Sequence, residues 1–267
     1  MNKFYQKKSF LNGFIDLVKK CNIKILDIYK SNYSEKYKDD KSPLTNADLE
    51  SNKLICEYIQ LLNKNIKKEI NEDLCIISEE NKNMNYEKRK DYNYTWLIDP
   101  IDGTKEFLKK NGQFTVNIGL CKNGIPIFGI VSIPVYDDIY YGIEGIGSYK
   151  IDKNDNKIKL EIKQNKDLEK DNIKIIASSS HMNEETLNYI KKFKNPNLLN
   201  IGSSIKLLYI AENKADLYPR FALTSEWDTC AAHAIIKYSN GNVINIEDKK
   251  ELKYNKENLL NPYFLVY

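Results

Sequence analysis

Strand-forming runs fill almost all of the sequence between residues 114 and 143, and no other stretch limits the possible folds as strongly. The runs FTVNIGLC, GIPIFGIVSI and DDIYYGI are rich in β-branched and aromatic residues, which favour strands. Asn-Gly, Pro and Asp-Asp steps separate the runs, and such steps are typical of the turns that join neighbouring strands. The pattern therefore predicts an antiparallel sheet.

Helical patterns surround this sheet. Apolar residues in 10–28 recur at three-and-four spacing, and a second helix is expected to begin near Thr45 or Asn46, either of which can cap it. The segment between them, 31–42, is expected to be an exposed loop or a mobile hairpin. Further along, EWDTCAAHAIIKYSNG is expected to form a buried helix that stops at Gly241. Blocks of helices and antiparallel strands indicate α+β layers rather than a doubly wound parallel sheet.

Composition excludes several classes of protein. The 41 basic and 37 acidic residues are mixed along the chain, for a net charge of +4, so no basic stripe points to nucleic acid, although a small anionic ligand stays open. Five widely spaced cysteines without a CxxC pair indicate reduced thiols. No apolar run reaches the roughly 18 residues of a membrane span, and the start MNKFYQKKSFLNGF lacks a secretory core. We expect a cytoplasmic protein, with an organelle-directing extension as the alternative.

The string WLIDPIDGTKEF, residues 96–107, carries the strongest chemical signal. A buried strand is expected to end in Asp99, Pro100 breaks it, and Asp102 and Gly103 open what looks like a helix. Two carboxylates on either side of a sharp turn can converge on one hard cation, and the carbonyl group of Ile101 offers a further oxygen. Backbone amides at a helix start can face a phosphate.

The simpler alternative is that these carboxylates only cap backbone amides, which is the usual role of an isolated DxxD. Other acidic residues at similar positions argue against it. Glu79 and Glu80 follow a predicted buried strand, while Asp48 and Asp228 fall in the first turns of predicted helices. Because functional sites are commonly built at the ends of such elements, the set predicts an oxygen-only cation site.

DPIDGT followed by Phe, together with WDTCAAHAII, closely resembles the two signature motifs of the inositol monophosphatase superfamily. Within this superfamily, the sequence of these motifs is most similar to the branch of 3'(2'),5'-bisphosphate nucleotidases of the CysQ type. The similar segments run in the family's order from about residue 42 to 264 and are SPLTNADLESN, IISEEN, WLIDPIDGTKEFLKKNGQFTVNIGL, ASSSH, IGSSIK, LYPRF, EWDTCAAHA and LLNPYF. The resemblance implies a layered αβαβα sandwich with the site in a cleft between two halves. Residues 1–145 would form an N-terminal α+β half carrying most metal ligands, and 146–267 a C-terminal half carrying the nucleotide contacts and Asp228.

The resemblance also implies roles for individual residues. The ligands of two or three Mg²⁺ ions would be Glu79, Asp99, the carbonyl of Ile101, Asp102 and Asp228. The residues that orient and deprotonate the attacking water would be Asp48, Thr104 and Glu79. The substrate contacts would be backbone amides of Gly103 and Thr104 on the scissile phosphate, and His181, Ser203, Lys206, Arg220 and Asp228 on the nucleotide.

The implied activity is Mg²⁺-dependent removal of the 3'-phosphate from adenosine 3',5'-bisphosphate by metal-activated water, giving AMP, and its extension to the 5'-phosphosulfate relative. Lys206 and Arg220 suit this substrate, because a second phosphate needs positive charge. Inhibition by lithium is implied as well. The alternatives are an inositol or sugar-phosphate phosphatase of the same superfamily and a non-catalytic nucleotide-phosphate binding protein. The expected partner is a small-molecule nucleotide bisphosphate, and the oligomeric state stays open.

Several of these residues also have structural interpretations. Ser203 or Ser204 could cap the following helix, and Arg220 could pair with a surface acid. His233, in the middle of the WDTCAAHA helix, is expected to be a packed helix residue. Serines stand at 178–180, where the family commonly has a serine and an arginine before its histidine, so one basic contact is expected to be absent.

Overall fold

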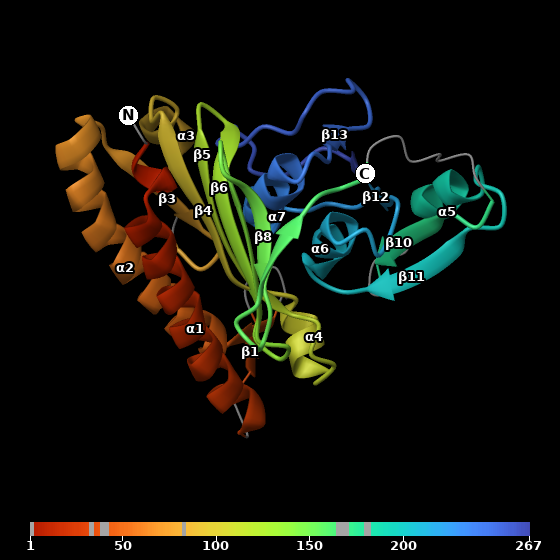
Figure 1. Cartoon of the computed structure of the whole chain (residues 1–267), viewed down its shortest axis with the longest axis horizontal. Helices are drawn as coiled ribbons and strands as arrows, with labels where there is room; N and C mark the ends of the chain where they lie inside the picture. Colours follow the sequence, from red (N-terminus) through yellow and green to blue (C-terminus); the bar gives the residue numbers. More distant parts are fainter. Residues whose placement is uncertain (1–2, 32–34, 38–42, 82–83, 164–170, 179–182) are drawn as a thin grey trace.

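Two long helices form the first layer of the protein. The computed structural model describes residues 3–31, 35–37, 43–81, 84–163, 171–178 and 183–267. A short 3₁₀ helix, η1 (Phe4–Gln6), leads into α1 (Lys8–Lys30), and α2 (Asn46–Ile70) packs beside it (Figure 1). Thr45 is the N-cap of α2, as one of the two predicted caps, and its side chain accepts hydrogen bonds from the amides of Ala47 and Asp48 at 3.2 and 3.4 Å.

A seven-stranded sheet forms the second layer, with its strands arranged in chain order. The strands are β3 (Leu74–Ser78), β4 (Tyr94–Asp102), β5 (Thr115–Lys122), β6 (Ile125–Ile133), β7 (Asp138–Ile143), β8 (Gly147–Ile151) and β9 (Lys157–Leu160). From β4 to β9 every neighbouring pair is antiparallel, which confirms the predicted antiparallel sheet. The pair β3–β4 is parallel, because the chain crosses over through α3 (Tyr86–Arg89) between the two strands.

Aromatic side chains join the first two layers. The Phe14 ring of α1 lies 5.2 Å from the Trp96 ring of β4 and 5.0 Å from the Phe128 ring of β6, measured between centroids. All three side chains are fully buried. Their burial fixes α1 against the centre of the sheet.

On the opposite face of the sheet, α7 (Glu226–Tyr238) packs directly over three strands at positions occupied by glycine. Gly119, Gly129 and Gly142 are register partners on β5, β6 and β7. A Cβ atom on Gly129 would lie 2.1 Å from the carbonyl oxygen of Ala231, and one on Gly142 would lie 2.6 Å from that of Ala234. The helix and the sheet therefore approach so closely that a side chain at any of these three glycine positions would clash with α7.

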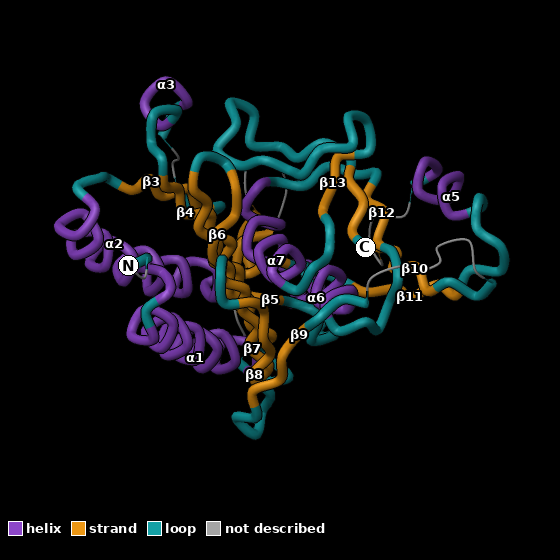
Figure 2. The backbone as a smooth tube through the Cα atoms, turned by 45° about the horizontal axis from the view of Figure 1, so that its top comes forward, coloured by secondary structure: helices purple, strands orange, loops and turns teal. Residues whose placement is uncertain are grey.

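Smaller elements complete the third, fourth and fifth layers, and the expected αβαβα sandwich is confirmed (Figures 1 and 2). Helix α6 (Ile205–Ala211) packs beside α7, two small sheets follow, and α5 (Glu184–Ile190) lies outside them. The small sheets contain the parallel pair β10 (Lys174–Ser178) and β11 (Asn197–Ile201), and the antiparallel set β12 (Tyr218–Arg220), β14 (Phe264–Val266) and β13 (Val243–Asn245). The large sheet continues through β8 and β9, past residue 145.

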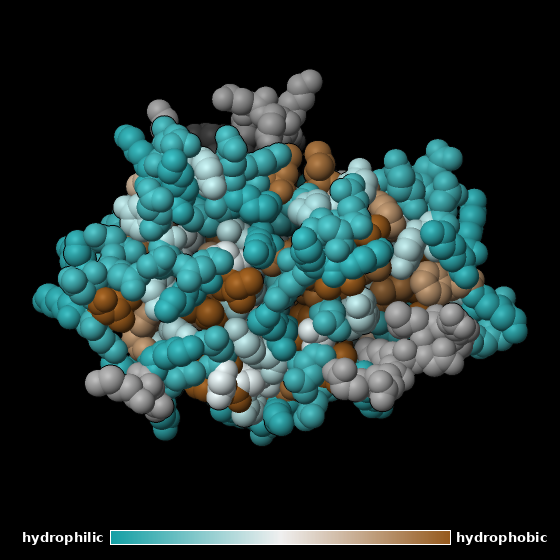
Figure 3. Space-filling model, turned by 90° about the horizontal axis from the view of Figure 1, so that it is seen from above, coloured by the Kyte–Doolittle hydropathy of each residue, from teal (hydrophilic) through white to brown (hydrophobic). Residues whose placement is uncertain are grey.

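The predicted exposed segment 31–42 is only partly described. Within it β1 (Glu35–Tyr37) pairs antiparallel with β2 (Pro43–Thr45), as a hairpin would. Residues 32–34 and 38–42 lie outside the described residues. None of the described helices is both long and apolar enough to cross a bilayer. The face shown in Figure 3 is mostly hydrophilic, with hydrophobic residues in limited patches.

Candidate active site

The end of β4, the short helix α4 (Thr104–Leu108) and the start of α7 meet around a cleft of about 420 Å³. Most of the predicted site residues lie on its wall. They are Glu79, Asp99, Ile101, Asp102, Gly103, Thr104, Ser203, Lys206, Arg220 and Asp228. The structure therefore brings together in one cleft residues that lie far apart in the sequence, from Glu79 to Asp228.

One of the predicted residues lies outside the cleft, and another is not among the described residues. Asp48 is 1% exposed and does not line the cleft. It lies behind Thr104, whose Oγ1 is 3.3 Å from Asp48 Oδ1 and 3.3 Å from the carbonyl oxygen of Ile101. The second oxygen of Asp48 accepts the Thr45 amide at 2.8 Å, so the capping box of α2 orients the carboxylate toward Thr104. His181 lies outside the described residues.

The DPID turn gives its two aspartates different surroundings. The β4–β5 register shifts between Asp99 and Asp102, which marks an irregularity in the strand. Asp99 Oδ1 accepts the amide of Ile101 at 3.0 Å, so this carboxylate does hold a backbone amide as the simpler interpretation expected. Asp102 Oδ2 accepts the hydroxyl of Ser203 at 2.8 Å and also the amide of Ser204. Both carboxylates nevertheless face the cleft.

Gly103 joins this turn to α4 in a conformation that favours glycine. Its φ is +94°, and an added Cβ would lie 2.9 Å from the carbonyl oxygen of Gln113 and 3.2 Å from the Ser203 Cβ. A side chain here would be strained and would push the facing loop away. The glycine therefore lets the DPID turn and the Ser203 turn come together.

Glu79 and Asp228 reach the same cleft for two different reasons. Because β3 and β4 are parallel, with Ser78 opposite Ile98, their carboxyl ends meet at one edge of the sheet. Glu79 therefore lies beside Asp99, and its amide donates to the carbonyl of Ile98 at 3.1 Å. Asp228 lies in the first turn of α7, where its Oδ2 accepts the amide of Ser225 at 2.9 Å.

The cluster is electrostatically strained. Burial raises the pKa of Asp99 well above its usual range, and the charges of Glu79, Asp102 and Asp228 raise it further. Burial also raises the pKa of Asp228, again with help from Asp102. For Asp102, burial raises the pKa, although Lys206 and the hydrogen bonds from Ser203 and Ser204 oppose the shift. A cation in the cleft would relieve this repulsion.

The donor set suits Mg²⁺ by its chemistry. Every candidate ligand is an oxygen atom, and hard divalent cations prefer carboxylate and carbonyl oxygens. In the described part of the chain, no three His, Cys, Asp or Glu side chains are grouped closely enough to hold a metal ion as they stand. The carboxylates thus line the same side of the cleft and raise one another's pKa, but in this structure they do not surround a single metal position.

Two buried cations, Lys206 and Arg220, line the same cleft as the carboxylates. Lys206 is 7% exposed, its Nζ donates to the carbonyl of Ser203 at 2.6 Å, and burial lowers its pKa to about 8. Arg220 is 8% exposed and donates to the carbonyls of Ala222 and Leu223, both at 3.1 Å. These carbonyl contacts hold Arg220 in place, and it forms no ion pair with a surface acid among the described residues.

Sequence reasoning missed a buried network beneath the cleft. Thr115 Oγ1 lies 2.7 Å from the Ser203 hydroxyl and 2.8 Å from the Ser204 hydroxyl. Asn117 accepts the Ser204 hydroxyl at 2.8 Å and donates to Thr115 at 3.1 Å. Polar residues at alternate positions of an otherwise apolar strand were the available signal. The network ties the turn that supports Asp102 to β5.

His233 is packed in the helix, as predicted. It is 1% exposed, its Nδ1 lies 2.9 Å from the Tyr254 hydroxyl, and its Nε2 lies 3.1 Å from Glu251. Ser204 is the N-terminal cap residue of α6 by position, but its side chain makes no capping hydrogen bond. The hydroxyls of Ser203 and Ser204 serve the Thr115 network instead.

Comparison with known proteins agrees with this architecture. The model of the inositol monophosphatase family matches residues 6–263. The chain belongs to the inositol monophosphatase family. It is 36% identical over 245 residues to a 3'(2'),5'-bisphosphate nucleotidase CysQ of Buchnera aphidicola, covering 91% of this chain and 86% of that protein. It is 35% identical over 258 residues to the CysQ of Salmonella typhimurium, covering 96% and 98%. Family members generally depend on Mg²⁺.

Solved structures of the family have the same fold. The crystal structure of CysQ from Bacteroides thetaiotaomicron matches with a TM-score of 0.80 and 37% identity, covering 96% of each chain. A staphylococcal inositol monophosphatase determined with 2'-AMP bound matches with a TM-score of 0.72 at 19% identity, covering 97% of this chain and 89% of that one. The second likeness concerns the fold alone.

Proposed function

We propose that this protein is a Mg²⁺-dependent 3'(2'),5'-bisphosphate nucleotidase. It hydrolyses the 3'-phosphate of adenosine 3',5'-bisphosphate to give AMP and phosphate, and it acts in the same way on the 5'-phosphosulfate relative. The observation that carries the proposal is that one cleft holds the carboxylates of the DPID turn together with buried Lys206 and Arg220. A substrate with two phosphates uses both groups of residues, whereas a monophosphate uses one.

The residues divide the reaction between them. Glu79, Asp99, Ile101, Asp102 and Asp228 would hold Mg²⁺, which when bound neutralises phosphate oxygens and makes water more acidic. Asp48 accepts a hydrogen bond from the Thr104 hydroxyl, and this pair, with Glu79, orients the attacking water. The amides of Gly103 and Thr104 face the scissile phosphate at the start of α4. No protein nucleophile is needed for this hydrolysis.

Lys206 and Arg220, with Ser203 and His181, bind the rest of the nucleotide. Both cations are buried, so their charge acts on a bound phosphate with little screening by water. Arg220 also holds the loop that carries Leu223, through the Leu223 carbonyl. The Leu223 side chain is 66% exposed and that of Leu260 is 39% exposed, and both residues line the cleft. Two apolar side chains in a charged cleft favour a ligand with a flat, apolar part such as a nucleobase.

We also propose that the protein works in the cytoplasm, a reducing compartment. All five cysteines are buried and unpaired, as predicted.

A substrate panel tests the proposed activity. Phosphate release is measured with Mg²⁺ from adenosine 3',5'-bisphosphate, its 5'-phosphosulfate relative, inositol 1-phosphate and fructose 1,6-bisphosphate. We expect the highest kcat/KM for the adenosine bisphosphate. Faster turnover of inositol 1-phosphate would overturn the substrate assignment, and phosphate release that survives Asp99→Asn would overturn the proposed site.

A further inference from the structure

The C-terminal motif LLNPYF lies against the first turn of α7, the turn that carries Asp228. The amide of Glu226 donates to the carbonyl of Leu259 at 2.8 Å, and the amide of Asn261 donates to that of Thr224 at 2.8 Å. Between these two bonds, Ser225 and Leu260 form an antiparallel bridge. The final segment of the chain is therefore paired with the cap of α7 rather than merely passing over it.

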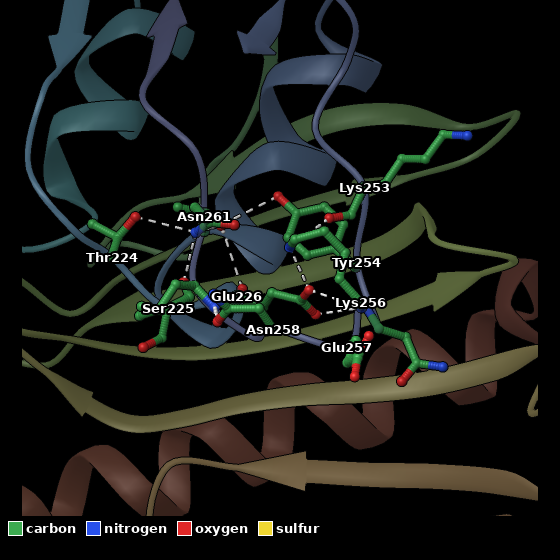
Figure 4. Close-up of polar contacts among 12 residues, drawn as sticks. Thr224, Ser225, Glu226, Lys253, Tyr254, Lys256, Glu257, Asn258 and Asn261 are labelled. Carbon is green, nitrogen blue, oxygen red and sulfur yellow. Dashed lines mark hydrogen bonds and ion pairs between the residues drawn. The ribbon is translucent and has the colours of Figure 1, made fainter. Parts of the chain in front are cut away.

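The side chain of Asn261 adds a second set of contacts from inside the fold (Figure 4). Its Nδ2, which carries two hydrogens, donates to the Ser225 carbonyl at 2.7 Å and lies within hydrogen-bond distance of Thr229 Oγ1 at 3.0 Å and of Thr224 Oγ1 at 3.1 Å. The Ser225 carbonyl can only accept, so the nitrogen of the amide must face this side. One buried amide group thus joins three residues around the first turn of the helix.

The oxygen of the same amide is left without a partner. Asn261 is 4% exposed, and its Oδ1 has no hydrogen-bond partner in the described structure. A buried acceptor without a partner is unfavourable, so the side chain is held in place by the contacts of its nitrogen.

Glu226 holds the opposite side of the turn. Its fully buried carboxylate accepts the amide of Lys256 at 3.0 Å and pairs with the Lys256 ammonium (Figure 4). The C-terminal segment therefore contacts the first turn of α7 on two sides, through Lys256 and through Asn261. Asn261 is on the side of the cleft, because the residues that it contacts, Thr224, Ser225 and Thr229, line the cleft.

We propose that Asn261 is a positioning residue that fixes the carboxylate of Asp228 for metal binding. Asp228 is held by the amide of Ser225, and Ser225 is held through its carbonyl by Asn261. Loss of the Asn261 side-chain amide removes the hydrogen bond to the Ser225 carbonyl but leaves the backbone bridge between Ser225 and Leu260. The first turn of α7 then becomes less rigid, and the Asp228 carboxylate samples more orientations. The inference rests on the proposed function, in which Asp228 is a ligand of Mg²⁺. Residues that orient metal ligands commonly change metal affinity by 10- to 100-fold when replaced.

The test measures metal binding without substrate. Full-length wild type, Asn261→Ala and the nearly isosteric Asn261→Asp are titrated with Mn²⁺, and free Mn²⁺ is followed by electron paramagnetic resonance. We expect about tenfold weaker Mn²⁺ binding in Asn261→Ala. The Mg²⁺ concentration for half-maximal phosphate release should rise by a similar factor, with kcat largely recovered at saturating Mg²⁺.

Asn22→Ala is the matched control. Asn22 is also a buried asparagine, 3% exposed, and it accepts the Ser132 hydroxyl at 2.8 Å in the α1 layer, while its own Nδ2 has no partner among the described residues. This variant should lower the thermal midpoint without changing the affinity for Mn²⁺. A loss of stability alone in Asn261→Ala and Asn261→Asp, with wild-type affinity for Mn²⁺, overturns the inference.

Asp228→Asn separates this failure from failure of the proposed function. If Asp228→Asn weakens Mn²⁺ binding and the Asn261 variants do not, only the role of Asn261 is wrong. If Asp228→Asn also binds Mn²⁺ as wild type does, the assignment of Asp228 as a ligand is wrong, and the inference is overturned with it.

Discussion

Replacing Gly129 by alanine should displace α7 and remove activity through a contact far from the substrate. The new Cβ would lie 2.1 Å from the Ala231 carbonyl oxygen and 2.8 Å from the Ala231 Cα. Ordinary contact begins near 3.4 Å, so the helix must move by the difference between 3.4 and 2.1 Å, about 1.3 Å. The clashing atoms are backbone, and no rotation of a side chain can relieve the overlap.

Two magnitudes follow from this displacement. Overpacking of a close-packed interior typically costs about 1–3 kcal/mol of the free energy of unfolding. Asp228 moves with the helix, and a misplacement of about 1 Å in a catalytic arrangement can cost about a hundredfold in rate. We expect both losses in Gly129→Ala, measured by denaturant unfolding and by the kcat for Mg²⁺-dependent phosphate release.

Gly13→Ala provides a matched control. A Cβ on Gly13 would also lie 2.1 Å from its nearest neighbour, but that neighbour is the hydroxyl oxygen of Tyr58, the end of a side chain that can rotate away. Alanine in the interior of α1 also has better helix propensity, by up to about 1 kcal/mol. We expect stability and kcat near those of wild type. If Gly129→Ala behaves like Gly13→Ala in both assays, the close approach of α7 does not position the site.

Three further predictions concern the cleft itself. Asp99→Asn removes a buried charge whose pKa is raised by burial and neighbouring carboxylates, so it should raise the thermal midpoint of metal-free protein near pH 7.5 while abolishing Mg²⁺-dependent phosphate release; a lower midpoint without metal would contradict this. The Lys206 ammonium loses its proton as pH rises through its pKa of about 8, so the KM for adenosine bisphosphate should rise roughly tenfold between pH 7 and 9; steady-state kinetics that give a flat profile would refute the role of this charge. Leu223→Ser should raise the KM for adenosine bisphosphate about tenfold and leave that for inositol 1-phosphate unchanged, with Leu198→Ser, 40% exposed on β11, as the control; equal effects on both substrates would argue against a nucleobase contact.

Local patterns predicted much of the fold. The helix at 10–28, the cap at Thr45 and the antiparallel strands after residue 114 all depend on residues close together in the chain, so periodicity and turn residues were enough to find them. The parallel pairing of β3 with β4 was not predicted, because it depends on a crossover whose return path leaves little trace in the sequence.

The site was predicted in the same uneven way. Asp99 and Asp102 could be found because acidic residues at the end of a buried strand are conspicuous in the sequence. Thr115 and Asn117 could not, because their role depends on the turn at Ser203, which comes much later in the chain. Asn261 was recognised only as part of a motif, and its contacts with the first turn of α7 follow from the path of the C-terminal segment.

The sequence alone determined which residue types could do the chemistry and at which ends of helices and strands they would lie. Short-range preferences for capping, turning and alternation act within a few residues, so they can be read from the chain. The sequence grouped Asp228 with Asp99 in one predicted site, but only the tertiary structure decided how Asp228 reaches the cleft that Asp99 lines. That meeting depends on the three glycines that let α7 lie directly on the sheet, and on Asn261, which holds the first turn of that helix. Packing between distant segments has no local signature, because its free energy arises only when the surfaces come together.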